Sequence, residues 1–181
     1  MKLEYHKDNL TLRILNERDA IQVLDFYARN AEYFDCYETE KPDNFYTLDF
    51  IENLLNAEYN GFLHGKYVRM FLFDDQYPDE IIGCVSFSDI RGGAMTSCAT
   101  GYKIDKKYQC QGYAKKMLAM ALGIMIMERG MHRIEAYICP DNTPSIALVQ
   151  KLGFISEGTA YSYVQLNGIW QDHLRYVYIA I

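Results

Sequence analysis

The chain has 181 residues, half of them hydrophobic, and a formal net charge of −6 at pH 7. This length and composition predict one domain, residues 1–181, with its own hydrophobic core. The negative charge disfavours direct binding to nucleic acid or to an anionic membrane surface, so an anionic ligand would need a local positive site.

The cysteines and the first residues indicate a compartment. The start of the chain, MKLEYHKDNL, does not resemble a signal peptide, and no run of 18 apolar residues follows. The five cysteines are scattered without a C-x-x-C pair, which is typical of reduced thiols and not of a disulfide framework or a zinc site. We therefore expect a cytoplasmic protein that uses no metal.

The first predicted elements are a strand and a helix. LTLRIL (10–15) alternates between apolar and polar residues, as a half-buried strand does. A helix over 16–30 follows, with Asn16 as its N-cap. Its expected apolar face consists of Ile21, Leu24 and Tyr27 or Ala28.

The next segment, residues 31–46, lacks a regular period and contains Pro42, so we expect a long connecting loop. Thr47 then caps a helix over 47–61. The apolar stripe of that helix is formed by Ile51, Leu54, Leu55 and Tyr59. Three strands follow, the first two as an antiparallel hairpin: 67–73, 80–90 and 97–104.

The clearest helix pattern lies between Gly112 and Gly130. Its apolar residues recur at spacings of three and four: Ala114, Met117, Leu118, Ala121, Leu122 and Met125. A strand over 132–139 comes next.

The last predicted helix, 141–153, has Asn142 as its N-cap and ends at Gly153. Two closing strands over 158–166 and 172–181 are joined by a turn at NGIW. The order of all these elements predicts an α/β fold, with a mixed sheet and helices on its faces.

The stretch QCQGYA (109–114) lies between the expected strand 97–104 and the expected helix that begins at Gly112. Such a turn presents free backbone N–H groups and the positive end of the helix dipole. Because Gly112 has no side chain and Ala114 a small one, a phosphate can approach the backbone closely. Four lysines supply local positive charge: Lys106, Lys107, Lys115 and Lys116. The alternative is a glycine that only eases a turn, beside lysines on a solvated face.

The pattern Gln109-x-x-Gly112-x-Ala114 resembles the coenzyme A pyrophosphate loop of the GNAT N-acetyltransferase superfamily. The resemblance extends from Ile81 to Ile179 through HRIEAYI, PDNTPS, KLGF and EG. More narrowly, several segments are similar to the ribosomal-protein-alanine N-acetyltransferases: FYARN, IIGCVSFSDIRGG, GYKID, HRIEAY, DNTPS, KLGFISEG and NGIWQDH.

The resemblance implies a GNAT-type fold, whose central, mostly antiparallel sheet is splayed at the cofactor site and has helices on both faces. It also implies acetyl-CoA as cosubstrate. The pyrophosphate would lie on Gln109, Cys110, Gln111, Gly112, Tyr113, Ala114 and Lys115. The pantetheine arm would pair with Tyr102, Lys103 and Ile104 like an added strand, with Asn142 and Ser145 nearby. Asn142 can alternatively serve only as a helix cap, and the two roles are compatible.

The catalytic residues are less well specified. Many superfamily members carry a tyrosine acid where this chain has Val149, and related members often carry a glutamate where it has Ala99. The candidates that remain are Glu135, Cys98 and Tyr102. Cys98 or Cys110 as an acyl carrier is one alternative to direct attack by the amine. Glu135, His132 and His173 can equally be structural residues.

A chain without a strong base is better matched to an α-amine than to a lysine or a polyamine. A free α-amine has a pKa near ~8, so roughly a tenth of it is neutral at pH 7, whereas a lysine amine titrates near ~10.4. We therefore expect an acetyl-CoA-dependent N-acetyltransferase that acts on a protein or peptide N-terminus, such as that of a ribosomal protein. A basic acceptor would contact four acidic residues: Asp35, Glu38, Glu40 and Asp43.

Two alternatives remain open. One is acetylation of a small amine, such as a polyamine, an aminoglycoside or an amino acid, and the other is a noncatalytic CoA-binding module. We expect no membrane or direct nucleic-acid partner, and either a monomer or a homodimer.

Overall fold

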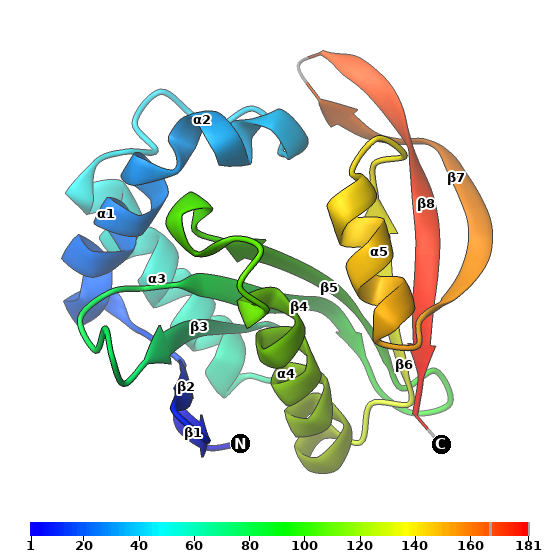
Figure 1. Ribbon diagram of the computed structural model, residues 1–181, viewed down its shortest axis with the longest axis horizontal. Helices are drawn as coiled ribbons and strands as arrows, with labels where there is room; N and C mark the ends of the chain where they lie inside the picture. The colour runs from blue at the N-terminus through cyan, green and yellow to red at the C-terminus, as the bar shows by residue number, and fades with distance from the viewer. Residues whose placement is uncertain (167, 181) are drawn as a thin grey trace.

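The computed structural model describes residues 1–166 and 168–180, which form one eight-stranded sheet flanked by helices (Figure 1). The strands are β1 (Glu4–Lys7), β2 (Leu10–Arg13), β3 (Val68–Asp74), β4 (Gly83–Arg91), β5 (Ser97–Ile104), β6 (Arg133–Ile138), β7 (Ile155–Leu166) and β8 (Ile169–Ile179). The helices are α1 (Ala20–Arg29), α2 (Ala31–Phe34), α3 (Leu48–Leu63), α4 (Tyr113–Arg129) and α5 (Thr143–Lys151). Three short 3-10 turns are η1 (Glu17–Asp19), η2 (Asp35–Tyr37) and η3 (Lys106–Tyr108).

The strands lie in the order β1-β2-β3-β4-β5-β6-β8-β7. Every neighbouring pair is antiparallel except β5 and β6, which are parallel and joined by α4. The β5–β6 pairing covers only 97–99 on β5 and 133–135 on β6. The mixed, mostly antiparallel sheet expected from the sequence is therefore confirmed.

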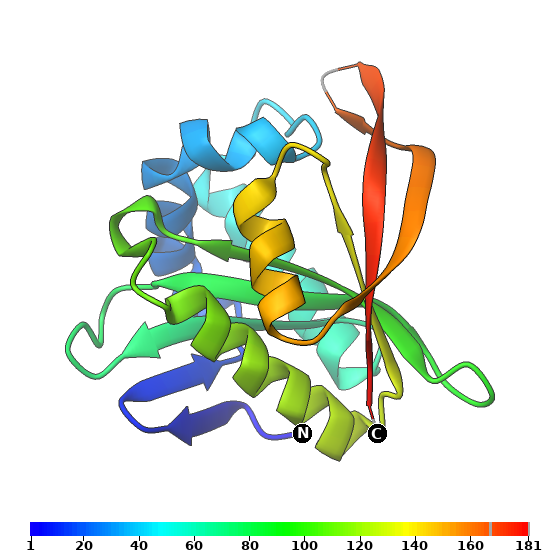
Figure 2. The ribbon, with the colours of Figure 1, turned by 45° about the vertical axis from the view of Figure 1, so that its right-hand side comes forward.

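The helices cover both faces of the sheet, and each face has its own hydrophobic core. On one face, α4 and α5 pack on the sheet through residues such as Met117, Leu118 and Val149. On the other face, α1 and α3 pack through Val23, Phe26, Ile51 and Leu55. In Figure 2, α4 and α5 stand in front of the sheet and α3 lies behind it. No helix of the described residues is long and apolar enough to cross a membrane.

The N-terminal strand β1 was not expected from the sequence. It pairs antiparallel with β2 at the edge of the sheet, across a turn in which Asp8 has a positive φ of 54°. Three of its four residues are exposed, so β1 carries no alternating apolar signal.

The segment 31–46 is more ordered than the expected loop, because α2 and η2 occupy its first seven residues. Phe34 is buried there and packs against Phe26, with 5.4 Å between ring centroids. An element of four residues is shorter than a period can reveal, so the sequence pattern did not disclose it.

The buried face of α1 also differs from the expected one. It is formed by Ala20, Val23, Phe26 and Tyr27, whereas Ile21 is 74% exposed. Two overlapping apolar stripes were available, and the stripe with two aromatic rings is buried because it removes more apolar surface from water.

The expected helix caps at Thr47, Asn142 and Gly130 are confirmed, but α3 continues past the expected end at Gly61 to Leu63, and Asn16 caps the turn η1 ahead of α1. Asn16 and Thr47 accept backbone hydrogen bonds as caps of η1 and α3, and Asn142 caps α5. Gly130 ends α4 in the left-handed conformation. The closing strands are longer than expected, and the predicted turn at NGIW includes Asn167, which lies outside the described residues.

Candidate active site

The loop between η3 and α4 contains the QCQGYA stretch. Gly112 is the N-cap of α4 with φ 85°, and no side chain caps the helix there. Outside Gly112 and its two chain neighbours, no atom of the described residues lies within 4 Å of the position that a Cβ of Gly112 would take. The first hydrogen bond of the helix is donated by the backbone N–H of Lys116 to the Gly112 carbonyl, at 3.2 Å. The N–H groups of the first turn are thus available to an anion.

The other residues predicted for this loop lie around the same turn. Cys110 and Gln111 are exposed, and the Gln111 side-chain amide donates to the Lys107 carbonyl at 3.0 Å. Tyr113 turns inward and its hydroxyl donates to Asp74 Oδ2 at 2.9 Å. All four flanking lysines are exposed, and Lys107 pairs with Glu80 at 3.0 Å.

A buried carboxylate, Asp105, anchors the start of the loop. Arg29 Nε donates to Asp105 Oδ2 at 2.6 Å and Asn30 Nδ2 donates to the same oxygen at 2.8 Å. Asn30 Oδ1 in turn accepts from the backbone N–H of Lys106 at 2.9 Å. Burial works against ionisation of Asp105, but these hydrogen bonds outweigh it and lower the pKa of its carboxyl. The end of α1 is thereby fixed to the end of β5.

The sequence signal for this anchor is the FYARN stretch, one of the segments that resemble the ribosomal-protein-alanine N-acetyltransferases. Its two polar residues, Arg29 and Asn30, hold Asp105 across 76 and 75 positions of sequence. A sequence pattern alone does not reveal such a long-range partner.

The sheet opens beside this loop. Pairing between β5 and β6 ends at Ala99 and Glu135, whereas β5 stays paired with β4 through Ile104 and β6 stays paired with β8 through Ile138. Within the described residues, the edges 100–104 of β5 and 136–138 of β6 thus face each other without pairing. An extended chain can bind such an edge as an added strand.

Tyr102, Asn142 and Ser145 meet on the α5 side of this opening. The Tyr102 hydroxyl donates to the Ser145 carbonyl at 3.3 Å, and Asn142 Oδ1 accepts from the Ser145 N–H at 3.3 Å. Burial raises the pKa of the Tyr102 hydroxyl, so it stays protonated at neutral pH. Val149, one turn further along α5, is fully buried. Tyr102 thus reaches the neighbourhood of α5 in which the tyrosine of other superfamily members was expected.

Lys103 points to the opposite face, because neighbouring residues of a strand alternate. Its ammonium group pairs with Glu38 and lies over the rings of Tyr27 and Phe34, 5.1 and 5.5 Å from their centroids. Ile104 points back into the core between the sheet and α4.

Glu135 also lies on the face opposite α4 and α5. Its carboxylate accepts hydrogen bonds from Arg133 Nε at 2.7 Å, Tyr137 Oη at 2.7 Å and Arg175 Nη2 at 2.9 Å. Burial raises its pKa, but these three hydrogen bonds outweigh that effect and lower the pKa to about 2. A carboxylate with so low a pKa is a weak proton acceptor at neutral pH.

Cys98 is 2% exposed and belongs to the core under α4. Burial and, to a smaller degree, the charge of Glu135 raise the pKa of its thiol to about 12. Since the thiolate is the nucleophile, this environment does not favour an acyl-carrier role.

The two candidate histidines differ in their surroundings. His132 is exposed ahead of β6. His173 is buried, and its Nε2 lies 3.3 Å from Cys139 Sγ. The contact of His173 is a structural one between β8 and the end of β6.

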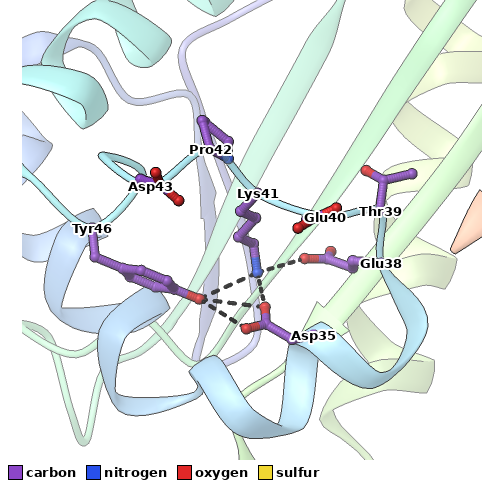
Figure 3. A pocket seen from close by; sticks show the side chains of 8 residues that line it. All are labelled: Asp35, Glu38, Thr39, Glu40, Lys41, Pro42, Asp43 and Tyr46. Atoms are coloured by element: carbon purple, nitrogen blue, oxygen red, sulfur yellow. Dashed lines mark hydrogen bonds and ion pairs between the residues drawn. The ribbon is translucent and has the colours of Figure 1, made fainter. Parts of the chain in front are cut away.

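Two adjoining cavities lie on the face of Lys103, beneath the segment between η2 and α3. The first, of about 280 Å³, is lined by Asp35, Glu38, Thr39, Glu40, Lys41, Pro42, Asp43 and Tyr46. Figure 3 shows the Lys41 ammonium group pointing towards Asp35, Glu38 and Tyr46. The second, of about 330 Å³, reaches the sheet at Arg69 and Lys103. The four acidic residues that we expected to contact a basic acceptor, Asp35, Glu38, Glu40 and Asp43, therefore all line the first cavity.

In the described part of the chain, no group of three or more His, Cys, Asp or Glu side chains is arranged to hold a metal ion. The candidate site consists of the N-terminus of α4, the open edge of β5 and the acidic cavity.

A family model described as an acetyltransferase (GNAT) domain matches residues 9–155. The chain is 31% identical over 175 residues to the ribosomal protein uS5-alanine N-acetyltransferase of Escherichia coli (strain K12), covering 96% of this chain and 89% of the relative.

Two solved structures are similar over most of the chain. The ribosomal-protein-S5-alanine acetyltransferase from Vibrio fischeri has a TM-score of 0.92 and 25% identity, over 98% of this chain and 97% of that chain. Mycobacterium smegmatis RimJ in complex with CoA-disulfide has a TM-score of 0.88 and 25% identity, over 94% of this chain and 82% of that chain.

Proposed function

Because the chain belongs to the GNAT acetyltransferase family, we propose that it transfers an acetyl group from acetyl-CoA to the N-terminal α-amine of a protein or peptide. The names of the relatives make a ribosomal protein the first acceptor to test. We further propose that residues 1–181 act as a single catalytic domain.

The observation that carries the proposal is the open edge of β5, which leads through η3 and the loop that follows it to the uncapped N-terminus of α4. The free N–H groups of α4 and the helix dipole suit a pyrophosphate, and the absence of a Cβ at Gly112 leaves room for it. The backbone of 102–104 suits a pantetheine arm that binds like a strand. Acetyl-CoA supplies the activated acetyl group when it is bound.

The acceptor amine approaches from the opposite face of the sheet, because α4 and α5 cover the cofactor face. Two residues of β5 that point towards this acceptor face near the closed end of the opening are small, namely Ala99 and Gly101, and Lys103 follows them on the same face. The two small residues leave a path for an amine to reach the thioester between β5 and β6. The amine attacks directly, without an acyl-enzyme on Cys98 or Cys110.

The amine attacks in its neutral form, and Glu135 serves mainly to position its neighbours. Three donors already occupy the Glu135 carboxylate, and its pKa of about 2 suits a fixed anion better than a base. The Tyr102 hydroxyl, protonated and close to α5, is the group proposed to donate a proton to the departing thiolate.

The acidic segment between η2 and α3 favours an acceptor with positive charge beyond its α-amine. Asp35, Glu38, Glu40 and Asp43 line one cavity with a single lysine, Lys41. A basic peptide would place its side chains there, in keeping with the net charge of −6.

A polyamine would satisfy the same charges, so a small amine is the second candidate. The experiment that separates the candidates measures release of the CoA thiol with a thiol-reactive dye. It uses acetyl-CoA with an alanine-terminated basic peptide, the same peptide with a blocked N-terminus, and spermidine. Turnover only with the free N-terminus supports the proposal, and turnover only with spermidine contradicts it. No turnover with any amine would leave a noncatalytic CoA-binding module.

A further inference from the structure

The loop 109–112, which we propose for the pyrophosphate of CoA, has a strained backbone. Cys110 has a φ of 58° and Gly112 a φ of 85°. A residue with a side chain, such as Cys110, is strained at a positive φ and keeps it only where the surrounding structure fixes the chain. The contacts that fix this loop lie at its two ends.

Each end of the loop carries a tyrosine whose hydroxyl donates to a carboxylate. Tyr108 ends η3 directly ahead of the loop and donates to Glu80. Tyr113 begins α4 directly after the loop and donates to Asp74 Oδ2 at 2.9 Å. Asp74 ends β3, and Glu80 lies between β3 and β4. Both ends of the loop are thus tied to one short segment, residues 74–80, which we call the β3–β4 turn.

The carboxylate of Asp74 is itself firmly held. It is 2% exposed, its Oδ1 accepts from the backbone N–H of Gln76 at 2.9 Å, and its Oδ2 also accepts from Asn9 Nδ2 at 2.7 Å. Burial opposes ionisation of Asp74, but the hydrogen bonds outweigh it and lower the pKa of the carboxyl. Burial and the bond to Asp74 raise the pKa of Tyr113 to about 12, so its hydroxyl remains a donor at neutral pH. The Tyr113–Asp74 contact is therefore a charge-assisted hydrogen bond on a fixed support.

The rings of the same tyrosines pack on the turn and on each other. The ring centroid of Tyr108 lies 5.5 Å from that of Tyr77 in the turn and 5.8 Å from that of Tyr113. The Lys107 ammonium group lies 5.0 Å from the centroid of the Tyr108 ring and pairs with Glu80 at 3.0 Å. A change of either tyrosine to phenylalanine keeps its ring in place and removes only the hydroxyl.

The charge of Asp74 does not explain its position. A carboxylate near the first turn of a helix repels an anion that binds at the same turn. Lys116, in the first turn of α4, offsets this charge and helps to keep the pKa of Asp74 low. What Asp74 supplies to the loop is a fixed hydrogen-bond acceptor for Tyr113.

We propose that the β3–β4 turn holds the loop 109–112 in its anion-binding shape before CoA binds. The proposal rests on the proposed function for its ligand. Because the loop is fixed at both ends, the pyrophosphate meets backbone N–H groups that are already in place. Such preorganisation raises affinity, since less of the chain has to be ordered on binding. Asp74 and Glu80 act through the two tyrosines and are positioning residues.

The test compares wild type, Tyr108→Phe and Tyr113→Phe in the full-length protein. In each variant one end of the loop is released, so calorimetry should show a Kd for CoA raised by about tenfold, which corresponds to one hydrogen bond. The KM for acetyl-CoA should rise by a similar factor. The kcat and the KM for an alanine-terminated peptide should stay within about twofold, because the loop contacts the pyrophosphate and not the reacting atoms.

A truncated cosubstrate separates this role from a general distortion of the active site. S-acetyl-pantetheine carries the thioester but lacks the pyrophosphate and the adenosine. Its kcat/KM should be the same in wild type and in Tyr113→Phe, whereas the kcat/KM for acetyl-CoA should fall about tenfold.

Tyr5→Phe is the matched control. The Tyr5 hydroxyl donates to Glu128 Oε2 at 2.8 Å, so it forms the same kind of contact near the other end of α4. This variant should keep the wild-type Kd for CoA. Tyr108 and Tyr113 belong to different elements, so each variant tests the role even if the other fails to fold.

The positioning role is refuted if both loop variants bind CoA as tightly as Tyr5→Phe. It is equally refuted if the kcat/KM for S-acetyl-pantetheine falls as far as that for acetyl-CoA. A wild type that binds CoA but acetylates no amine contradicts the proposed transfer, while tenfold weaker CoA binding in the loop variants still supports the positioning role. A wild type that binds no CoA contradicts both.

Discussion

Ala99 and Glu135 are register partners at the last paired position between β5 and β6. Beyond them the two strands separate, so the pair marks the closed end of the opening that we assign to acetyl-CoA. Related superfamily members often carry a glutamate at the position of Ala99. The structure places a carboxylate directly beside that position, on the neighbouring strand.

This carboxylate is not free to act as a base. Arg133, Tyr137 and Arg175 donate to Glu135, and Arg133 and Arg175 also pair with Glu157 on β7. The network ties three strands together beside the opening. We therefore assign Glu135 to holding the opening in shape, and we expect the ionisation of the amine itself to control the rate.

The first prediction concerns Gly112. Gly112→Val should abolish calorimetric binding of CoA, because a branched side chain would fill the space that the pyrophosphate needs. Gly130→Val is the matched control, since Gly130 has a similar positive φ, 64° against 85°, and equally open surroundings at the other end of α4. Both variants carry similar backbone strain, but only the first should lose binding. Equal affinities of the two variants would refute the assigned loop.

The second prediction concerns the anchor of that loop. Asp105→Asn should lower the free energy of unfolding by about 2–3 kcal/mol at pH 7, because it leaves Arg29 without its buried partner. Asp25→Asn removes the exposed partner of the same arginine and should change stability by less than about 0.5 kcal/mol.

The same anchor predicts a dependence of stability on pH. The folded pKa of Asp105 is lowered below its unfolded value of about 3.9, so its ionisation stabilises the fold above that value. The contribution is lost as the pH falls through the folded pKa. The stability difference between wild type and Asp105→Asn should thus shrink below about pH 4. Urea unfolding at several pH values measures it, and a constant difference would contradict the assignment.

The third prediction concerns Cys98. Cys98→Ala should keep kcat within about threefold of wild type, because the thiol is buried and protonated and takes no part in the transfer. Iodoacetamide should label the exposed Cys36 and Cys110 well before Cys98. Loss of activity in a folded Cys98→Ala variant, or a trapped acetylated cysteine, would restore the acyl-carrier alternative.

The fourth prediction concerns Tyr102. Tyr102→Phe should lower kcat by about 100-fold and leave the KM for acetyl-CoA nearly unchanged, since only the proton donor is removed. Tyr161→Phe, at a 79% exposed position of β7, should behave as wild type. An unchanged kcat in Tyr102→Phe would mean that the thiolate leaves without help from this hydroxyl.

Much of the fold was predictable because local signals agreed with it. The helix between Gly112 and Gly130 combines a regular apolar period with a left-handed glycine at each end. The caps at Thr47 and Asn142 were equally plain in the sequence. Where two apolar stripes overlap, as in α1, the sequence does not say which one the sheet will cover.

The candidate site was predictable only where its residues are close in sequence. The loop that we propose for the cofactor is one continuous stretch, so a local sequence pattern was enough to predict it. The Asp105 anchor and the two contacts of the β3–β4 turn, Tyr108–Glu80 and Tyr113–Asp74, join residues from separate elements. No local pattern marks such partners, because the sheet topology brings them together.

The central claim is that a neutral peptide α-amine attacks acetyl-CoA without a strong protein base. It is tested most directly by the pH profile of kcat/KM for acetylation of an alanine-terminated peptide, measured for wild type and Glu135→Gln. We predict one acidic limb with an apparent pKa near that of the peptide amine, about 8, which stays in place in the slower Glu135→Gln variant. A limb well below the amine pKa that disappears in Glu135→Gln would contradict the account and identify Glu135 as the base.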